Sequence, residues 1–285
     1  MTPLRQLFIE TLTNRNYSTR TIEAYVFWVA AFARLFGKSP EVLGPDEIHK
    51  FQVWLQSQRR TSWSAFNQAM CALRFLYREV LLRPDVLPRI HFMRRERKLP
   101  VVLSPEEVSA LLSSVHDLVQ RTILTTIYAC GLRLGEALSL RIGDIDPALM
   151  IVHVRLGKGR KDRNVGLSPV LLQMLRAYCR AKHPSGWLFP SRRDPSKPFH
   201  PTSVQKAIRA AAQRAGITKA VSPHTLRHSY ATHAMNDGAP MRVLQVALGH
   251  RSINTTQLYT HVSPEALIKM RSPLDTLPPP PKKRR

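Results

Sequence analysis

An interruption between two blocks of helical pattern constrains the fold of this chain more than any other feature. The helix-like spacing of apolar residues stops after Leu82 and resumes after Pro100. Pro84, Pro88 and Pro100 frame the basic run RRERK at 94–98, which has no apolar face, as is typical of a linker. The length of 285 residues is enough for one large domain or two ordinary ones. We therefore predict a domain at 1–83, a basic linker at 84–100, a second domain at 101–272 and a disordered Pro/Lys/Arg tail at 273–285.

The first domain is predicted to be helical. Apolar residues recur at helical spacing over 18–36, 46–58 and 62–82, and Ser18 is placed to cap the first of these helices. Aromatic and methionine side chains such as Phe66 and Met70 sit at core spacing, which favours packing over base stacking. Arginines such as Arg74 lie off that apolar stripe, where either solvated charges or phosphate contacts fit the pattern.

The second domain begins with a clear helix start. Ser104, Pro105 and Glu107 form a capping box with proline at the first helical position, and a buried helix follows at 117–130. Gly131 then turns the chain so that Arg133 falls at another helix start. The helix dipole opposes a cation there, so we expect an anion nearby, although a lone arginine is more often a surface residue.

Two strands and a basic turn follow. Residues 151–155 and 163–167 alternate as strands do, and the glycine-rich turn GKGRKD between them carries Lys158. Lys158 thus lies at the tip of a predicted hairpin, where an exposed basic turn without function is the alternative. Helices are predicted at 169–182 and 202–215, the second ended by Gly216.

The stretch from Ser222 to Tyr259 contains an unusual number of imidazoles. Ser222 and Pro223 start a helix on which His224 and Arg227 lie three positions apart, and thus on one face. Gly249 ends the next helix directly before His250, and a short helix then carries Tyr259; a last helix is expected at 264–271. Four histidines beside an arginine in a basic chain indicate an anion site.

The charge of the chain favours a polyanionic partner. Lysine and arginine outnumber aspartate and glutamate 43 to 19, which gives a net charge of +24 spread along the chain. By charge alone, a ribosomal or other generally basic nucleic-acid binder is an equal alternative. Three cysteines without CxxC spacing suggest neither disulfides nor zinc, and no signal peptide or membrane span is recognisable. We expect a soluble cytoplasmic protein associated with the nucleoid.

The pattern of charged residues also narrows the chemistry. The chain offers arginines, histidines, a lysine and a tyrosine, but no phosphate-binding P-loop, no acidic pair for Mg²⁺ and no metal-ligand spacing. Phosphoryl transfer to a tyrosine hydroxyl fits this set. Fixed cationic donors stabilise the extra negative charge of its transition state, and a lysine on a hairpin can protonate the leaving oxygen.

These motifs together resemble the tyrosine recombinase, or phage integrase, family, with the bacterial Xer-type branch nearest. The resemblance rests on GLRLGE, GKGRK, HTLR, LGH and TTQLYTH in this order, and it covers nearly the whole chain. The set is specific although no single motif is. Gly166 stands where a proline is frequent in the family, and the helix expected after Tyr259 is short.

The resemblance implies a fold, a mechanism and partners. The fold is mainly α with a small β-hairpin: a helical, SAM-like core-binding domain and an α+β catalytic domain that clamp DNA in a C shape. Tyr259 is implied as the nucleophile of a 3′-phosphotyrosyl bond, Lys158 as the general acid and His224 as a proton-transfer group. Arg133, Arg227 and His250 are implied to hold the scissile phosphate. His228, His233 and His261 are expected to be structural.

The implied partners are two double-stranded DNA recombination sites, which a homo-tetramer joins through a Holliday junction, with accessory DNA-bending proteins as a further class. Neither metal nor ATP is expected, because the covalent link conserves the bond energy. A type IB topoisomerase and a non-catalytic architectural or repressor protein are the alternatives. Integrase, dimer resolvase and transposon recombinase are not distinguished, and neither the target sequence nor the role of PPPPKKRR is predicted.

Overall fold

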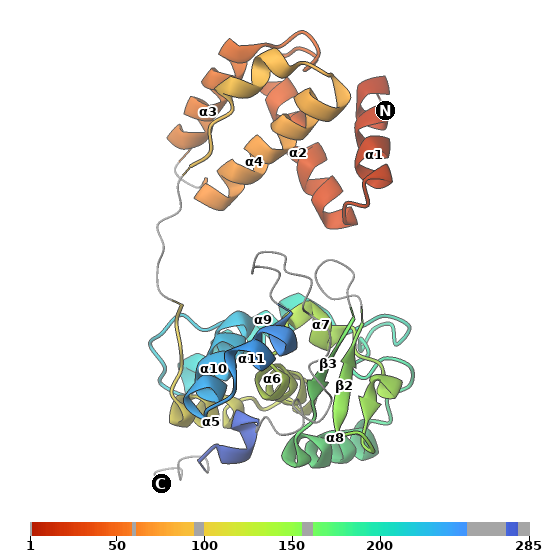
Figure 1. The fold of residues 1–285 in the computed structure, drawn as a ribbon, viewed down its shortest axis with the longest axis vertical. Coiled ribbons are helices and arrows are strands. Elements are labelled where there is room, and N and C mark those ends of the chain that lie inside the picture. The colour runs from red at the N-terminus through yellow and green to blue at the C-terminus, as the bar shows by residue number, and fades with distance from the viewer. Residues whose placement is uncertain (1, 59–60, 94–99, 156–161, 250–271, 279–285) are drawn as a thin grey trace. The chain divides into compact units, whose positions relative to one another are not determined.

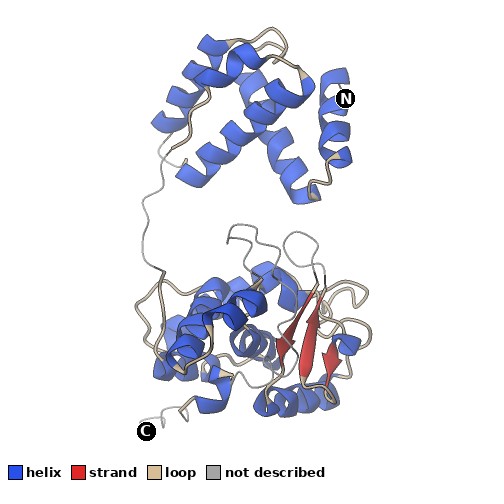
Figure 2. Ribbon diagram, viewed as in Figure 1, coloured by secondary structure: helices blue, strands red, loops and turns tan. Residues whose placement is uncertain are grey.

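The chain folds into two compact units, Met1–Lys98 and Leu99–Arg285 (Figure 1). The computed structural model describes residues 2–58, 61–93, 100–155, 162–249 and 272–278. Each unit has its own cluster of buried apolar side chains. The predicted fold class, mainly helical with one small sheet, is confirmed (Figure 2). Within the described ranges, no helix is both long and apolar enough to cross a membrane.

The first unit is entirely helical where it is described. Ser18 and Ser62 each accept a backbone N–H at the start of a helix, as their sequence positions predict. The predicted core stripe is confirmed, since Phe66 and Met70 are buried. The elements are α1 (Pro3–Asn14), α2 (Thr19–Phe36), α3 (Pro45–Ser57), α4 (Trp63–Phe75), the π-helix η1 (Leu76–Val80) and the 3₁₀ helix η2 (Pro84–Arg89).

Two features of this unit differ from the prediction. Helix α1 was not expected, although Thr2 caps it and Pro3 occupies its first turn, because it places only Phe8 and Leu12 fully in the core. The helix expected over 62–82 is not uniform: it ends as α4 and continues as the wider η1. Tyr77 in η1 donates its hydroxyl to the carbonyls of Pro40 and Leu43, so the widened turn is tied to the loop before α3.

The predicted start of the linker at residue 84 is wrong. Helix η2 packs against the first core and buries Val86, and Ile90 is buried directly after it. The Gln52 side chain donates to the Arg89 carbonyl and accepts the N–H of His91. The sequence did not predict these contacts, because the backbone polar groups of this proline-rich segment are paired with a side-chain amide and not with a regular pattern of backbone hydrogen bonds. The described chain therefore remains part of the first unit up to residue 93.

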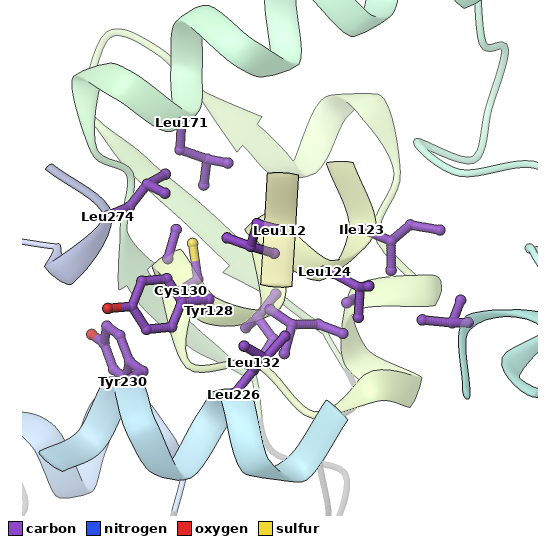
Figure 3. Packing of buried hydrophobic residues seen from close by; sticks show 14 of the residues in the cluster. Leu112, Ile123, Leu124, Tyr128, Cys130, Leu132, Leu171, Leu226, Tyr230 and Leu274 are labelled. Atoms are coloured by element: carbon purple, nitrogen blue, oxygen red, sulfur yellow. The ribbon is translucent and has the colours of Figure 1, made fainter. Parts of the chain in front are cut away.

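The second unit surrounds helix α6, in which every residue from Thr122 to Cys130 is buried. The close-up in Figure 3 shows side chains of this unit's buried cluster from several elements, among them Tyr128 of α6 and Tyr230 of α10. The helices are α5 (Pro105–Ser113), α6 (Leu118–Cys130), α7 (Leu134–Leu138), α8 (Pro169–Lys182), α9 (Pro201–Arg214), α10 (Pro223–Asn236) and α11 (Met241–Leu248), with the 3₁₀ turns η3 (Ile142–Asp144) and η4 (Pro273–Thr276). The predicted capping box at Ser104 and Glu107 is confirmed.

The sheet has three antiparallel strands in the order β1-β2-β3. The expected hairpin is present as β2 (Ile151–Val154) and β3 (Arg163–Gly166), with Val152 paired to Val165. Strand β1 (Ile145–Asp146) was not predicted, because two residues carry no readable alternation. The turn that carries Lys158 lies outside the described residues.

The prediction that the tail is disordered from residue 273 is also wrong. Leu274 in η4 is buried in the second core, and the Ser272 hydroxyl donates to the Ala129 carbonyl at the end of α6. The Ser109 hydroxyl of α5 donates to the Pro278 carbonyl. The proline-rich composition of this end of the chain predicted disorder, but one buried leucine and two hydrogen bonds hold residues 272–278 against the second core. The segments 250–271 and 279–285, which include the helix expected at 264–271, lie outside the described residues.

Candidate active site

Arg133 sits where the sequence places it, at the N-cap of the short helix α7. Its guanidinium donates to Glu136 Oε1 at 2.7 Å, and its backbone N–H donates to Glu136 Oε2 at 2.8 Å. The anion expected beside this helix start is therefore present within the chain, as the Glu136 carboxylate. Because Glu136 already balances the cation at this helix start, the helix dipole does not require a bound phosphate at this position.

Glu136 is the polar centre of the site. Its side chain is only 7% exposed and lies within 4 Å of three guanidiniums, those of Arg133, Arg163 and Arg227. Burial by itself raises the pKa of this carboxyl, but hydrogen bonds from Arg163 and from the Arg133 backbone overcome that effect and hold the pKa at about 2. Glu136 is thus ionised at neutral pH and fixes the arginines around it.

Arg227 is buried, with a side chain 6% exposed. It donates to the Gly131 carbonyl at 2.7 Å and to the Leu248 carbonyl, so it joins the end of α6 to the end of α11. Burial, and next the positive charge of Arg133, lower the pKa of Arg227 to about 10, which leaves it charged at pH 7. Such a partly desolvated cation is suited to binding an anion.

Gly131 permits this close packing. Its φ is +60°, and a Cβ atom there would lie 2.5 Å from Cδ1 of Tyr230 and 2.9 Å from Cδ2 of Leu248. Only glycine satisfies both the left-handed backbone and this contact. The glycine of the GLRLGE motif therefore lets α10 and α11 reach the turn that carries Arg133.

Two of the predicted phosphate ligands meet at the C-terminal end of α11. Arg133 Nη2 donates to the Gly249 carbonyl at 3.2 Å, next to the Leu248 carbonyl that Arg227 holds. Each guanidinium has five N–H donors, so both keep donors for another anion after these contacts. The chain continues from Gly249 directly into His250. The structure therefore brings Arg133 and Arg227 together beside the point where His250 begins.

The histidines of α10 differ in their surroundings. His224 is exposed in the first turn of the helix, one turn before the buried Arg227. His233 is buried: its Nδ1 accepts the Tyr128 hydroxyl at 2.9 Å and its Nε2 donates to the Leu103 carbonyl at 2.9 Å. The expected structural role of His233 is confirmed. His228 is more exposed, although partial burial lowers its pKa, and the structural role expected of it stays a prediction.

Three predicted site residues, Lys158, His250 and Tyr259, lie outside the described residues, as does His261. The sequence reasoning missed Glu136 and Arg163. Glu136 ends the motif GLRLGE and is followed by apolar residues, which was a usable signal for a buried carboxylate with a partner. Arg163 begins the strand after GKGRKD among charged and polar neighbours, so the local sequence did not indicate that it pairs with Glu136 across 27 positions.

Comparison with known proteins decides the family. The model of the phage integrase family matches residues 101–266, more than half of the chain, and that of the phage integrase N-terminal SAM-like domain matches residues 4–84. The chain belongs to the phage integrase, or tyrosine recombinase, family. Enzymes of this family cleave and transfer DNA strands, so the chain is a DNA-binding, site-specific recombinase.

Individual tyrosine recombinases are similar to this chain over nearly all of its length. Protein y4qK of Sinorhizobium fredii, assigned as an integrase/recombinase, is 42% identical over 98% of this chain and 91% of its own. Tyrosine recombinase XerC of Lactobacillus delbrueckii subsp. bulgaricus is 32% identical over 93% of this chain and 96% of its own. The fold resembles that of a lambda integrase dimer bound to a COC′ core site, with a TM-score of 0.71, 15% identity and coverage of 91% and 98%.

Proposed function

We propose that this recombinase cleaves one DNA strand at a time through a covalent bond between Tyr259 and the 3′ end of the cut strand. Tyr259 Oη attacks the scissile phosphorus, a P–O bond to the tyrosine forms, and the P–O5′ bond breaks. His224 takes part in removing the tyrosine proton, and Lys158 gives a proton to the leaving 5′-oxygen. Arg133, Arg227 and His250 bind the nonbridging oxygens of the phosphate.

The observation that carries this proposal is the convergence of Arg133 and Arg227 on neighbouring carbonyls, 249 and 248, at the end of α11. Two cations from separate elements are held beside the start of the segment 250–271, which contains His250 and Tyr259. A fixed pair of guanidiniums stabilises the negative charge that develops on the phosphate during transfer without reorganising at the moment of reaction.

The energy balance of this reaction needs no nucleotide. The phosphotyrosyl ester replaces a phosphodiester, so the 5′-hydroxyl of a second strand can attack it and restore a DNA backbone in the reverse step. In the proposed cycle, a homo-tetramer joins two double-stranded sites and passes through a Holliday junction. We propose that neither a metal ion nor ATP takes part.

Covalent capture tests the proposal. The full chain is incubated with a library of nicked duplexes whose centres are randomised, so that cleavage near a nick releases a short 5′-hydroxyl fragment and traps the protein. We expect a denaturant-resistant protein–DNA adduct that contains a defined subset of sequences. An adduct that persists in Tyr259→Phe, or the absence of any adduct from the library and from DNA of the source organism, would contradict the mechanism.

A further inference from the structure

Three arginines hold three consecutive carbonyls at the C-terminal end of α11. Arg163 Nε donates to the Ala247 carbonyl at 2.8 Å, Arg227 to that of Leu248, and Arg133 to that of Gly249. The last carbonyls of a helix lack partners within it and carry partial negative charge, so cations bind there favourably. Arg133 and Arg227 already have proposed roles at the phosphate, whereas Arg163 of β3 has none.

Arg163 also holds the carboxylate at the centre of the site. Its Nη1 and Nη2 donate to Glu136 Oε1 and Oε2 at 2.9 and 2.8 Å, and its side chain is only 8% exposed. With Nε on Ala247, the planar guanidinium uses all three of its nitrogens and joins β3, α7 and α11. A lysine has one nitrogen and no fork, so it cannot reproduce this set of contacts.

Gly249 ties the end of α11 still more closely to Arg163. A Cβ atom on Gly249 would lie 3.3 Å from Cδ, Nε and Cζ of Arg163, so the backbone rests directly on this side chain. The φ of Gly249 is +60°, which is the left-handed conformation that ends a helix. The backbone conformation that ends α11 at Gly249 therefore depends on the position of Arg163.

We propose that Arg163 is a positioning residue for DNA cleavage, which orients Arg133 through Glu136 and fixes the end of α11 from which the chain continues to His250. This inference rests on the proposed function of Arg133 and His250. Because Arg163 belongs to the strand that follows the Lys158 turn, it also links that hairpin to the arginine pair.

A role in stability alone does not account for this arrangement. A buried ion pair is weak evidence for stability, because desolvation of both charges offsets most of their attraction and apolar residues often replace such pairs without loss. The three nitrogens of the Arg163 guanidinium instead fix the positions of the Glu136 carboxylate and the Ala247 carbonyl. A misplacement of about 1 Å at a reacting centre lowers the rate by about 100-fold, so geometry is the property to measure.

The test compares three full-length variants: Arg163→Met, Arg163→Lys and the control Arg155→Met. Arg155 also donates from Nε to a buried carboxylate of the same sheet region, Asp144, at 2.6 Å, but its own side chain is 63% exposed. The probe is the nicked duplex recovered by covalent capture. The measurements are duplex affinity, the single-turnover rate of adduct formation at saturating duplex, and hydrogen exchange of the backbone amides of α11.

We expect Arg163→Met to lower the rate at saturation by about 100-fold with affinity changed only a few-fold. Arg163→Lys should recover part of the rate, and Arg155→Met should match the unaltered chain. Amide exchange near the end of α11 should rise in Arg163→Met but not in the control. An Arg163→Met variant with the unaltered rate would overturn the proposal, as would equal losses of affinity and rate.

The pH profile separates positioning from a general loss of structure. The charged groups within 4 Å of the Glu136 carboxylate in the described chain are Arg133, Arg163 and Arg227. Burial raises the pKa of Glu136 and the Arg163 guanidinium lowers it, so removal of Arg163 should raise this pKa. As the pH is lowered, the cleavage rate of Arg163→Met should therefore begin to fall at a higher pH than the rate of the unaltered chain. Parallel profiles would count against the proposal.

The two proposals fail in different ways. If the unaltered chain captures no DNA, the proposed function fails, and the exchange comparison still decides whether Arg163 fixes the end of α11. If the unaltered chain captures DNA and Arg163→Met does so equally fast, only the inference about Arg163 fails. If Arg163→Met does not fold, Arg163→Lys provides the same comparison with the charge retained.

Discussion

Glu136 is a buried carboxylate that accepts from a backbone N–H and from two guanidiniums, and a third guanidinium lies 3.7 Å away. Arginines that converge on one point repel one another, and the pKa of Arg227 is lowered partly for that reason. The single negative charge of Glu136 makes their convergence possible. Three arginines around one carboxylate leave an excess of positive charge, which suits a site for a phosphate.

Substitution of Glu136 by glutamine should lower the free energy of unfolding by about 3 kcal/mol at neutral pH, because it leaves buried arginines without their carboxylate. The pKa of this carboxyl falls from an ordinary 4.5 to about 2 on folding, so its stabilisation is present above pH 4.5 and is lost as the pH falls toward 2. Urea unfolding across this range should show a smaller loss for Glu136→Gln than for the unaltered chain. Equal losses in the two chains would argue against the predicted ionisation.

Removal of the Arg227 guanidinium should separate binding from cleavage. Because Arg227 is buried and Arg227→Ala leaves most of the basic surface intact, we expect DNA affinity to stay within a few-fold while adduct formation falls by about 100-fold or more. The exposed Arg192, which pairs with Asp117, serves as the control in Arg192→Ala. If Arg227→Ala lost binding and cleavage equally, Arg227 would have a binding role only.

At the scale of elements, the short turn η4 closes the second unit. Its Leu274 belongs to the same buried cluster as the tyrosines of α6 and α10 (Figure 3). We expect Leu274→Ala to lower the free energy of unfolding by about 2 to 3 kcal/mol, as other buried leucine truncations do. The partly buried Leu277 provides the comparison, and Leu277→Ala should cost less in the same urea titration. A Leu274→Ala variant as stable as the unaltered chain would show that this turn is not held in the core.

Local signals predicted the elements well. Capping residues such as Ser18, Ser104 and Ser222 each accept a backbone N–H at a predicted helix start, and Gly131 and Gly249 end helices in the left-handed conformation. These signals act within about four residues, so one sequence contains them. The prediction was wrong where apolar anchors lay inside proline-rich sequence, as Val86 and Leu274 do.

The candidate site was predictable only in part. The placement of Arg133 at a helix start and of Arg227 one turn into a helix follows from local sequence, but their meeting at the end of α11 joins residues 116 and 21 positions apart. Arg163 likewise pairs with Glu136 and Ala247 across 27 and 84 positions. Such contacts depend on how helices pack, which capping and periodicity do not determine. The roles of Lys158, His224, His250 and Tyr259 stay predictions that rest on motif resemblance.

At the scale of the whole molecule, charge sets how the recombinase meets DNA. The net charge of +24 is distributed over both units, so we expect each unit to contribute phosphate contacts. We expect the affinity for duplex DNA to fall steeply with salt, with log K linear in log salt concentration and a slope near −0.9 for each phosphate contacted. Fluorescence anisotropy over a salt series measures this slope. A slope near zero would contradict binding along the DNA backbone.

The recombinase has two units, each with its own core. The arginines proposed to bind the scissile phosphate lie in the second unit. In the proposed mechanism, Tyr259 becomes covalently attached to a 3′ phosphate. Mass spectrometry of the peptide that remains on captured DNA after protease and nuclease digestion tests this attachment. We expect a single nucleotide joined through its 3′ phosphate to Tyr259, with a free 5′-hydroxyl on the other fragment. Attachment to another residue, or through a 5′ phosphate, would contradict it.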